Sequence, residues 1–588
     1  MSELKGRKAI LVRNTKYGAM LTLLQYLMQF AIRTVMIYTI GVEYLGIGGL
    51  FANIIGCLGL VEMGMGAAIS FSMYKPVAEH DTEKIKSLHR LYRNIYYTIA
   101  IIILSVGLCL IPVLPLLIEG GMPDGINMYV VYGIFLLNTI ISYLTAHKRS
   151  LIIVNQRNDV ESKLRITGIL LLNLIQILVL LLAKNYYLYL IAMPICAAVE
   201  GILIVVWSKK LFPEINVKAA PIDKQTKKEI IKNITASSMH QLGGVLVLST
   251  DNIIISAMLG LFVLGTYSNY NVIITCIASF ITLITVTSQS SLGNLVATES
   301  PEYVYRRYNI FNFFMMWIVS FCTVCLICLF NPFVEIWTGG NNLLLNFGVV
   351  LLLCFNFYIS NSLSLTNVLN VSAGLIWYSR WKPLIQGITN LVTSIILTYY
   401  LGLVGVFIGT FISYLIVPIW IEPYILYKHY FRRSVSSYWL KYLIYTLAML
   451  IAGAVTYFVC SLLPSGGIGA LILKFSVCAV VPNVILLACL FWMPEFKECV
   501  KWGVSIIKGL IKKGKTQETV AVSNNDNAVI VSSIDLDKDG IVDVEVAIST
   551  TSLDDSDINN ESCDISNEAD AESNQTLVDN IVTEKEEQ

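Results

Sequence analysis

Fourteen apolar runs, each long enough to cross a lipid bilayer, constrain this chain more than any other feature. A membrane-spanning helix needs about 20 consecutive apolar residues. Hydrophobic residues make up 56% of the 588 residues and charged residues only 14%, which excludes an ordinary soluble globular protein. The runs lie at 17–40, 45–74, 94–118, 128–147, 164–183, 186–207, 234–259, 264–297, 309–330, 345–372, 383–401, 403–427, 440–463 and 468–493. We therefore predict an all-α polytopic membrane protein.

Basic residues alternate along the connections between these runs. The segments before the first run and after every second run are rich in Lys and Arg, whereas the intervening connections hold one basic residue, Lys184. Short cytoplasmic loops are enriched in Lys and Arg in this way. We therefore expect a multi-pass protein of the cell membrane with both termini in the cytoplasm.

An internal repeat divides the apolar part of the chain. The stretch IGVEYLG at 40–46 matches LGLFVLG at 259–265, a constant offset of 219 residues, and each stretch is a glycine-containing turn between two runs. The offset also aligns whole runs and their orientation. Parallel repeats of this kind are typical of transporters, in which the substrate path lies between the halves. The predicted fold is two pseudo-symmetric lobes of six helices followed by two C-terminal helices.

The charge pattern adds boundaries at both sides of these lobes. Residues 517–588 hold 19 Asp and Glu against two Lys and have no aromatic residue, a composition typical of disorder. The predicted order is an N-lobe at 1–207, a basic cytoplasmic inter-lobe loop at 208–233, a C-lobe at 234–427, spans 13 and 14 at 428–494, a basic juxtamembrane segment at 495–516 and an acidic, disordered cytoplasmic tail at 517–588.

Arg33 is the ionisable residue within the spans that is hardest to assign a purely structural role. It sits about 10 Å of helix rise from the expected external end of the first run, and its guanidinium keeps its charge and binds phosphate oxygens through a planar fork. At the repeat offset its counterpart is Asn252, beside Asp251. We expect these groups to face one another across a central cleft, where Arg33 and Asn252 bind substrate. A buried structural pair between Arg33 and Asp251 is the alternative.

Other ionisable residues lie within the spans or near their ends. Glu62, Glu200 and Asp251 are candidates for an acidic coupling or cavity group, although Glu62 and Glu200 also fit hydrogen bonding between helices. His240 and Glu422 lie near cytoplasmic ends, where snorkelling or capping accounts for them, and Lys474 fits an approach to the external headgroups.

No catalytic residue, metal or cofactor is expected. Thirteen cysteines are scattered through the chain, nearly all in apolar runs where they act as small hydrophobes. The spacing of Cys322, Cys325 and Cys328 imitates a cluster-binding run but lacks a fourth ligand. The expected external connections are short and offer no paired catalytic groups, and phosphate-loop and zinc-spaced motifs are absent from the sequence.

Two long stretches carry a family resemblance. Residues 33–93, from RTVMIYTIGVEYLG to SLHRLYR, together with STDNIIISAMLGLFVLGTYSNYNVIITCI and SLGNLVATES, resemble Wzx-type polysaccharide flippases of Gram-positive bacteria. Those flippases belong to the multidrug/oligosaccharidyl-lipid/polysaccharide exporter superfamily. The resemblance covers about residues 8–495 and implies a MATE-like, fourteen-span, two-lobe fold with alternating access around a cationic central cavity.

The resemblance implies a flippase that moves undecaprenyl-pyrophosphate-linked oligosaccharide across the cytoplasmic membrane, for capsule, exopolysaccharide or other surface glycans. Its partners would be the lipid-linked substrate, membrane lipids, and polysaccharide polymerases and glycosyltransferases, with no nucleic acid. Two other functions stay open. One is an ion-coupled multidrug or small-molecule exporter in which Glu62 or Asp251 binds a proton or sodium ion. The other is a non-transporting scaffold for polysaccharide synthesis that docks through its acidic tail.

Overall fold

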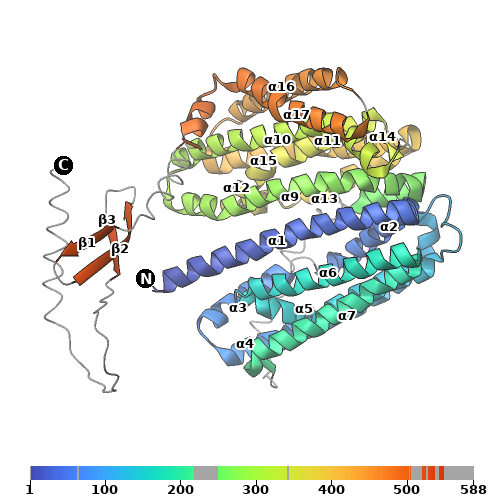
Figure 1. Ribbon diagram of the computed structural model, residues 1–588, viewed down its shortest axis with the longest axis horizontal. Helices are drawn as coiled ribbons and strands as arrows, with labels where there is room; N and C mark the ends of the chain where they lie inside the picture. The colour runs from blue at the N-terminus through green and yellow to red at the C-terminus, as the bar shows by residue number, and fades with distance from the viewer. Residues whose placement is uncertain are drawn as a thin grey trace. The chain divides into compact units, whose positions relative to one another are not determined.

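The computed structural model describes residues 2–62, 65–216, 249–340, 343–464, 466–501 and 503–504, and three strands between 520 and 547 (Figure 1). The chain divides into two units, Met1–Val500 and Lys501–Gln588. In the described residues twelve helices are long and apolar enough to cross a membrane. The prediction of an all-α multi-pass membrane protein is confirmed for the first unit.

The N-lobe and the start of the inter-lobe loop contain seven α-helices and three short 3-10 segments among the described residues. Helix α1 packs against α6, and α5 packs against both α4 and α7. The elements are α1 (Ser2–Thr39), α2 (Glu43–Leu58), η1 (Gly59–Glu62), α3 (Met65–Ala78), α4 (Thr82–Leu110), η2 (Ile111–Leu117), α5 (Met128–Val154), α6 (Asn158–Leu182), α7 (Tyr186–Leu211) and η3 (Pro213–Asn216).

The C-lobe begins with a helix at 249–259 and is organised around α10, the helix with the most buried residues. Its next elements are α9 (Leu261–Thr298), α10 (Pro301–Thr338), α11 (Phe347–Ser362), α12 (Ser364–Ser372), η5 (Leu375–Ser379), α13 (Lys382–Leu401), α14 (Leu403–Ile416), α15 (Pro418–Ile425) and the π-helical η6 (Leu426–Phe431). The two C-terminal spans, α16 (Ser436–Ser461) and α17 (Gly467–Leu490), pack on α10 (Figure 1).

Two of the fourteen predicted spans are not among the twelve long helices. The second, 45–74, is broken, because the 3-10 turn Gly59–Glu62 separates α2 from α3. Of the seventh, 234–259, only residues 249–259 are described, and they are helical. The described residues are therefore roughly consistent with the predicted fourteen spans.

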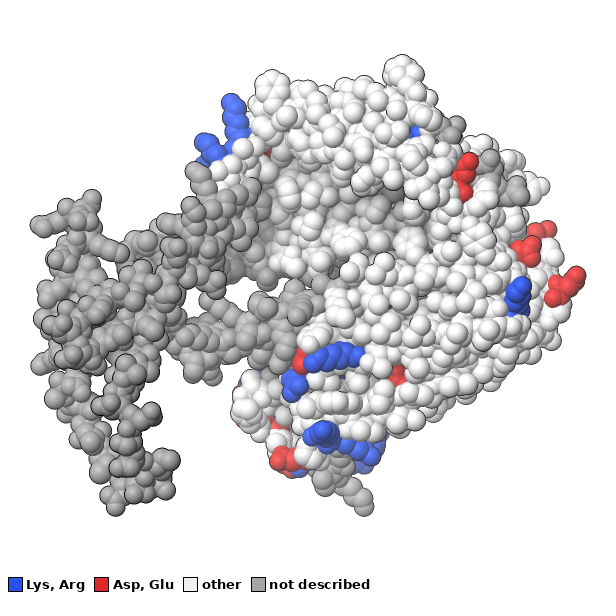
Figure 2. Space-filling view, in the orientation of Figure 1, with Lys and Arg blue, Asp and Glu red and all other residues white. Residues whose placement is uncertain are grey.

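Capping and side-chain exposure explain why the helices begin where they do and which faces they present. Asn residues cap three helices: the Asn127, Asn185 and Asn346 side chains accept from the amides of Tyr129, Leu188 and Gly348 at 2.9, 3.1 and 2.8 Å. Figure 2 shows a largely uncharged surface over the helices, as lipid contact requires.

The repeat is visible in the backbone as well as in the sequence. Gly41 precedes α2 with a φ of 112°, and its counterpart Gly260 precedes α9 with a φ of 86°, a region in which a residue with a side chain is strained. The next matching glycines meet across the lobes. A Cβ on Gly46 would lie 2.1 Å from the Leu261 carbonyl oxygen, and one on Gly265 would lie 2.2 Å from the Val42 carbonyl oxygen. Only glycine at both positions lets α2 and α9 pack backbone to backbone.

The second unit contains three antiparallel strands in the order β1-β2-β3: β1 (Val520–Asn524), β2 (Asn527–Leu536) and β3 (Val542–Ala547). Val520 pairs with Val531, and Val531 also pairs with Val546. Here the structure differs from the expected disordered tail. The reason lies in the local sequence, where Val and Ile alternate with polar residues at the period of a strand. Residues 548–588 lie outside the described residues, so their predicted disorder stays a prediction.

Candidate functional site

A cavity of about 1000 Å³ lies mainly within the N-lobe and reaches the C-lobe. Its walls come from polar stripes on several helices. On α1 the lining residues are Gln25, Gln29, Ile32, Arg33 and Met36, and on α6 they are Arg165, Ile169, Leu172, Asn173 and Gln176. Both sets follow the three- and four-residue spacing of one helix face. The C-lobe contributes Asn252, Ser268 and Asn271.

Arg33 lies in this cavity and connects the lobes. Its Nη1 donates to Ser268 Oγ at 2.9 Å and to Asn269 Oδ1 at 3.4 Å, and both acceptors are on α9. A guanidinium has five N–H donors in a planar fork. Both of these bonds use the same nitrogen, and within the described part of the chain neither Nε nor Nη2 makes a hydrogen bond, so both are open to an anion in the cavity.

Further contacts from α1 reach the C-lobe on either side of Arg33. About two turns before Arg33, the Tyr26 hydroxyl donates to the Thr275 carbonyl at 3.1 Å. On the other side, Trp337 Nε1 donates to Thr34 Oγ1 at 2.7 Å. Helix α1 is therefore held against α9 and α10, and a rotation of one lobe against the other must break or exchange these bonds.

A second cationic group in the cavity comes from α5 and α6. Arg149 forms an ion pair with Glu200 of α7 and lies 3.8 Å from Glu161, and Arg165 lies 3.9 Å from the same Glu161 oxygen. Gly168 makes room for this arrangement, because a Cβ there would lie 2.7 Å from Glu200 Oε2. Among the described lining residues are thus three arginines, Arg33, Arg149 and Arg165, and two glutamates, Glu62 and Glu200.

The sequence-predicted site residues fall into two groups in the structure. Arg33, Asn252, Glu62 and Glu200 line the same cavity, and Glu62 does so from η1 beside Tyr96 and Tyr143. Asp251 is separate from them. Within the described part of the chain it forms no ion pair with Arg33, so the alternative of a structural Arg33–Asp251 pair is not what the structure shows.

Asp251 belongs instead to a polar network inside the C-lobe. Thr410 donates to Asp251 Oδ2 at 2.9 Å, Asn390 Nδ2 donates to Thr410 Oγ1 at 2.9 Å, and Thr250 donates to Asn390 Oδ1 at 3.0 Å. The other carboxylate oxygen, Oδ1, is shielded from solvent and has no hydrogen-bond partner among the described residues. A carboxylate in neutral surroundings with one such oxygen is suited to bind a proton or a small cation.

Two other expectations about charged residues need comment. Glu422, expected to snorkel or cap near the interface, is only 4% exposed and forms an ion pair with Lys382 at the start of α13. His240 lies outside the described residues. Lys474 is half-buried and lines a smaller cavity with Cys328 and Cys460, and its approach to the external headgroups stays a prediction.

Sequence reasoning missed Arg149, Arg165 and the amides of α6 as cavity residues. It counted both arginines as ordinary cytoplasmic loop charge, because their positions agree with the orientation rule. The helical periodicity of α5 could have indicated Arg149 as a cavity residue. One face of the helix lines the cavity, with Ser142, Ala146, Arg149, Ser150 and Ile153.

Solved structures of similar fold are membrane transporters. A lipid II flippase MurJ in an inward closed conformation has a TM-score of 0.57 and 14% identity, covering 80% of this chain and 98% of that chain. The fold is that of the MATE and MurJ transporters. An inward-facing multidrug resistance MATE family transporter of the MOP superfamily has a TM-score of 0.54 and 14% identity, covering 70% and 95% of the two chains. A mutant of the Vibrio cholerae MATE transporter VcmN has a TM-score of 0.51 and 12% identity, covering 73% and 98%.

The MATE-like fold expected from the sequence is therefore confirmed, together with a multi-pass membrane location. No protein-family profile matches the chain, and no curated protein matches it. At identities of 12–14% the likeness concerns the fold.

Proposed function

We propose that this chain is a flippase that moves lipid-linked oligosaccharide pyrophosphates across the cytoplasmic membrane by alternating access. The observation that carries the proposal is the cavity of about 1000 Å³ that holds Arg33, Arg149 and Arg165 together. Pyrophosphate oxygens are recognised bidentately by guanidinium groups. The Asn, Gln and Tyr side chains of the same lining are hydrogen-bonding partners for sugar hydroxyls.

Arg33 and the Arg149 group have different parts in this mechanism. Among the described residues Arg33 is held through Nη1 alone, and it offers its remaining donors to a phosphate. Arg149 is neutralised by Glu200 and is released when the carboxylate turns away, so that an incoming anion replaces it. The lipid tail of the substrate stays in the membrane while the headgroup crosses between the lobes, as the parallel-repeat arrangement allows.

The experiment that tests the proposal uses cells whose surface glycan depends on this chain. At matched membrane levels, Arg33→Ala should abolish surface polysaccharide and trap the lipid-linked intermediate in the cytoplasmic leaflet, and Arg33→Lys should restore part of the export. The matched control is Arg307→Ala, because Arg307 contacts Tyr303 on its own helix and lies outside the cavity. Normal export from Arg33→Ala would refute the proposed role of Arg33.

A second candidate function rests on Asp251. Its oxygen without a partner among the described residues is the kind of group that an ion-coupled exporter of drugs or small molecules would use, and the fold is shared with a multidrug resistance MATE family transporter. Drug sensitivity of a deletion strain with normal surface polysaccharide would favour this function. In the flippase proposal the same network is the coupling site, so a role for Asp251 is compatible with both functions. The transported molecule distinguishes the flippase from the exporter.

A further inference from the structure

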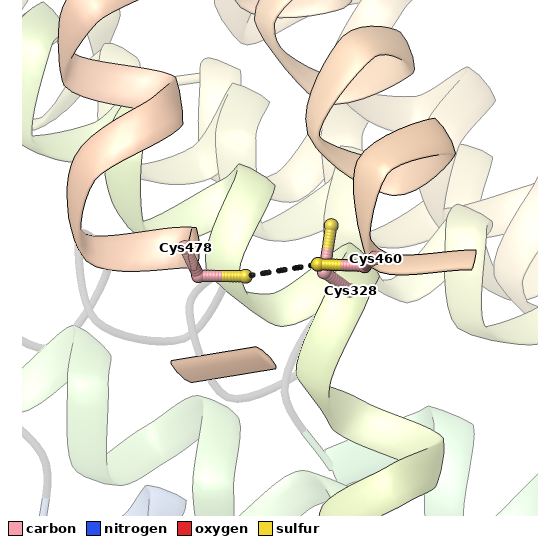
Figure 3. Close-up of side chains that lie close together, drawn as sticks. All are labelled: Cys328, Cys460 and Cys478. Atoms are coloured by element: carbon pink, nitrogen blue, oxygen red, sulfur yellow. Dashed lines mark hydrogen bonds between the residues drawn. The ribbon is translucent and has the colours of Figure 1, made fainter. Parts of the chain in front are cut away.

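Three cysteines that are far apart in the sequence meet inside the C-lobe (Figure 3). Cys328 comes from α10, Cys460 from α16 and Cys478 from α17, and all three are buried. Their sulfur atoms all lie within 4.8 Å of one another, and the Sγ atoms of Cys460 and Cys478 are 3.8 Å apart. This cluster is outside the polar cavity and takes no part in the proposed transport.

The separation of the sulfur atoms matches a metal-bound set of thiolates. With Zn–S bonds of about 2.3 Å and tetrahedral angles, two thiolate ligands of one zinc ion lie about 3.8 Å apart. Cys460 and Cys478 already have this spacing. Small side-chain rotations bring the Cys328 sulfur to the same distance, because no sulfur pair exceeds 4.8 Å.

A fourth cysteine and a lysine complete the surroundings. Cys325 lies one helical turn before Cys328, which gives the Cys-x-x-Cys spacing of zinc sites, and its Sγ is 3.7 Å from the carbonyl oxygen of Cys478. Lys474 lies one turn before Cys478 on α17 and lines a cavity of about 260 Å³ together with Cys328 and Cys460. This cavity gives an ion a path to the sulfur atoms.

We propose that Cys328, Cys460 and Cys478 bind one Zn²⁺ ion, with Cys325 placed to supply the fourth ligand. Binding forms a Zn–S bond at each ligating cysteine and releases one proton from each thiol. Three thiolates and Zn²⁺ leave one negative charge, which the neighbouring Lys474 ammonium offsets, and ligation by the Cys325 thiolate as well would leave two. The ion ties α16 and α17 to α10, so the site would hold the two C-terminal spans on the C-lobe.

Zinc content of the purified full-length protein is the direct test. Wild-type protein, loaded with ZnCl₂ and then desalted, should retain about one zinc ion per chain by elemental mass spectrometry. Cys460→Ser/Cys478→Ser should lose it, whereas Cys322→Ser should keep it, because Cys322 is on α10 but outside the cluster. Zinc content that is unchanged in the double variant, or absent from loaded wild-type protein, overturns the proposal.

Two measurements on wild-type protein do not depend on how a variant folds. Titration with Co²⁺ should give the sulfur-to-metal charge-transfer and intense visible bands of tetrahedral thiolate coordination, and added Zn²⁺ should displace them. Thiol alkylation under denaturing conditions should then modify Cys460 and Cys478. A disulfide between them, shown by intact mass and peptide mapping, would overturn the metal site in favour of a covalent link.

Discussion

Gly46 and Gly265 occupy the same position in the two repeats and are also neighbours across the interface between the lobes. A Cβ on Gly46 would lie 3.1 Å from the Gly265 amide nitrogen, and a Cβ on Gly265 would lie 3.2 Å from the Gly46 nitrogen. The repeat thus contacts itself near its pseudo-symmetry axis. This contact is beside Leu45, which lines the cavity.

Gly265→Ala should open this contact. The added methyl group would meet the Val42 carbonyl oxygen at 2.2 Å, and overpacking of this kind costs about 1–3 kcal/mol. We expect a lower Tm and faster labelling of an Asn252→Cys reporter by an impermeant maleimide applied from the side predicted to be external. Gly293→Ala on the same helix is the control, because a Cβ there meets nothing within 4 Å and alanine favours a helix by up to about 1 kcal/mol. Equal behaviour of the two variants would contradict the role of the glycine contact.

Lys382→Met should destabilise the protein strongly. Lys382 and Glu422 are a buried pair whose side chains are 11% and 5% exposed, and removal of one partner leaves an uncompensated charge, which costs about 3–5 kcal/mol. The double variant Lys382→Met/Glu422→Leu should recover most of that loss. Thermal unfolding in detergent measures both effects. Lys428→Met is the control, since Lys428 is exposed beside Tyr424; a loss as large in this control would rule out the buried pair as the cause.

Sodium should stabilise the wild-type protein through Asp251 if the network with Thr410 and Asn390 is the coupling site. A ligand at 100 times its Kd adds about 2.7 kcal/mol to the folded state. We expect Tm to rise when NaCl replaces choline chloride, and Asp251→Asn to abolish that rise. Glu62→Gln should keep the rise in Tm, because Glu62 lines the cavity that contains Arg33 and is not part of the Asp251 network. A sodium response that survives in Asp251→Asn and disappears in Glu62→Gln would assign coupling to Glu62 instead.

Arg149 and Glu200 should show a modest coupling energy. Their side chains are 30% and 21% exposed, so solvent screens the pair and a double-mutant cycle should give about 1 kcal/mol. Arg306 and Glu498 form the comparison pair, with Arg306 71% exposed, and their cycle should give less. A coupling energy near zero at Arg149–Glu200 would mean that Glu200 does not neutralise the arginine and would remove the proposed exchange with substrate.

Deletion of residues 517–588 should leave export intact if the tail is accessory. This separates a transporter from a scaffold, because a scaffold that docks through its acidic tail would lose surface polysaccharide on the same deletion. Quantified glycan at matched membrane levels is the readout. The variant must still be found in the membrane fraction, which its unchanged spans predict.

Hydropathy and the repeat predicted an all-α, two-lobed membrane protein, and the family resemblance implied the MATE-like fold. The 219-residue offset predicted the glycine turns at Gly41 and Gly260, and both have positive φ values that favour glycine. It also paired Arg33 with Asn252, and both line one cavity. The offset could not show which way Asp251 points. Neighbouring residues of a helix project about 100° apart, so Asn252 faces the cavity while Asp251 joins Thr410.

Contacts between distant parts of the chain were beyond sequence reasoning. The sequence showed the spacing of Cys325 and Cys328. It did not predict that Cys460 and Cys478 lie near Cys328, because that proximity depends on how α16 and α17 pack on α10. Likewise, the sequence showed Arg149 and Glu200 as separate charges. Their ion pair depends on the packing of α5 against α7, which the sequence did not show.

Asp251 and the three cavity arginines lie in different lobes, so under the proposed function recognition of the headgroup and ion coupling are assigned to different halves of the molecule. The lining of the cavity comes mostly from α1, α2, α5, α6 and α7, whereas the Asp251 network is built from 249–259, α13 and α14. Under the proposed function, substitutions in the cavity-lining helices can change which headgroup is bound without altering the Asp251 network. If the proposed function holds, the transported glycan can change through substitutions in the N-lobe while the Asp251 network in the C-lobe stays the same.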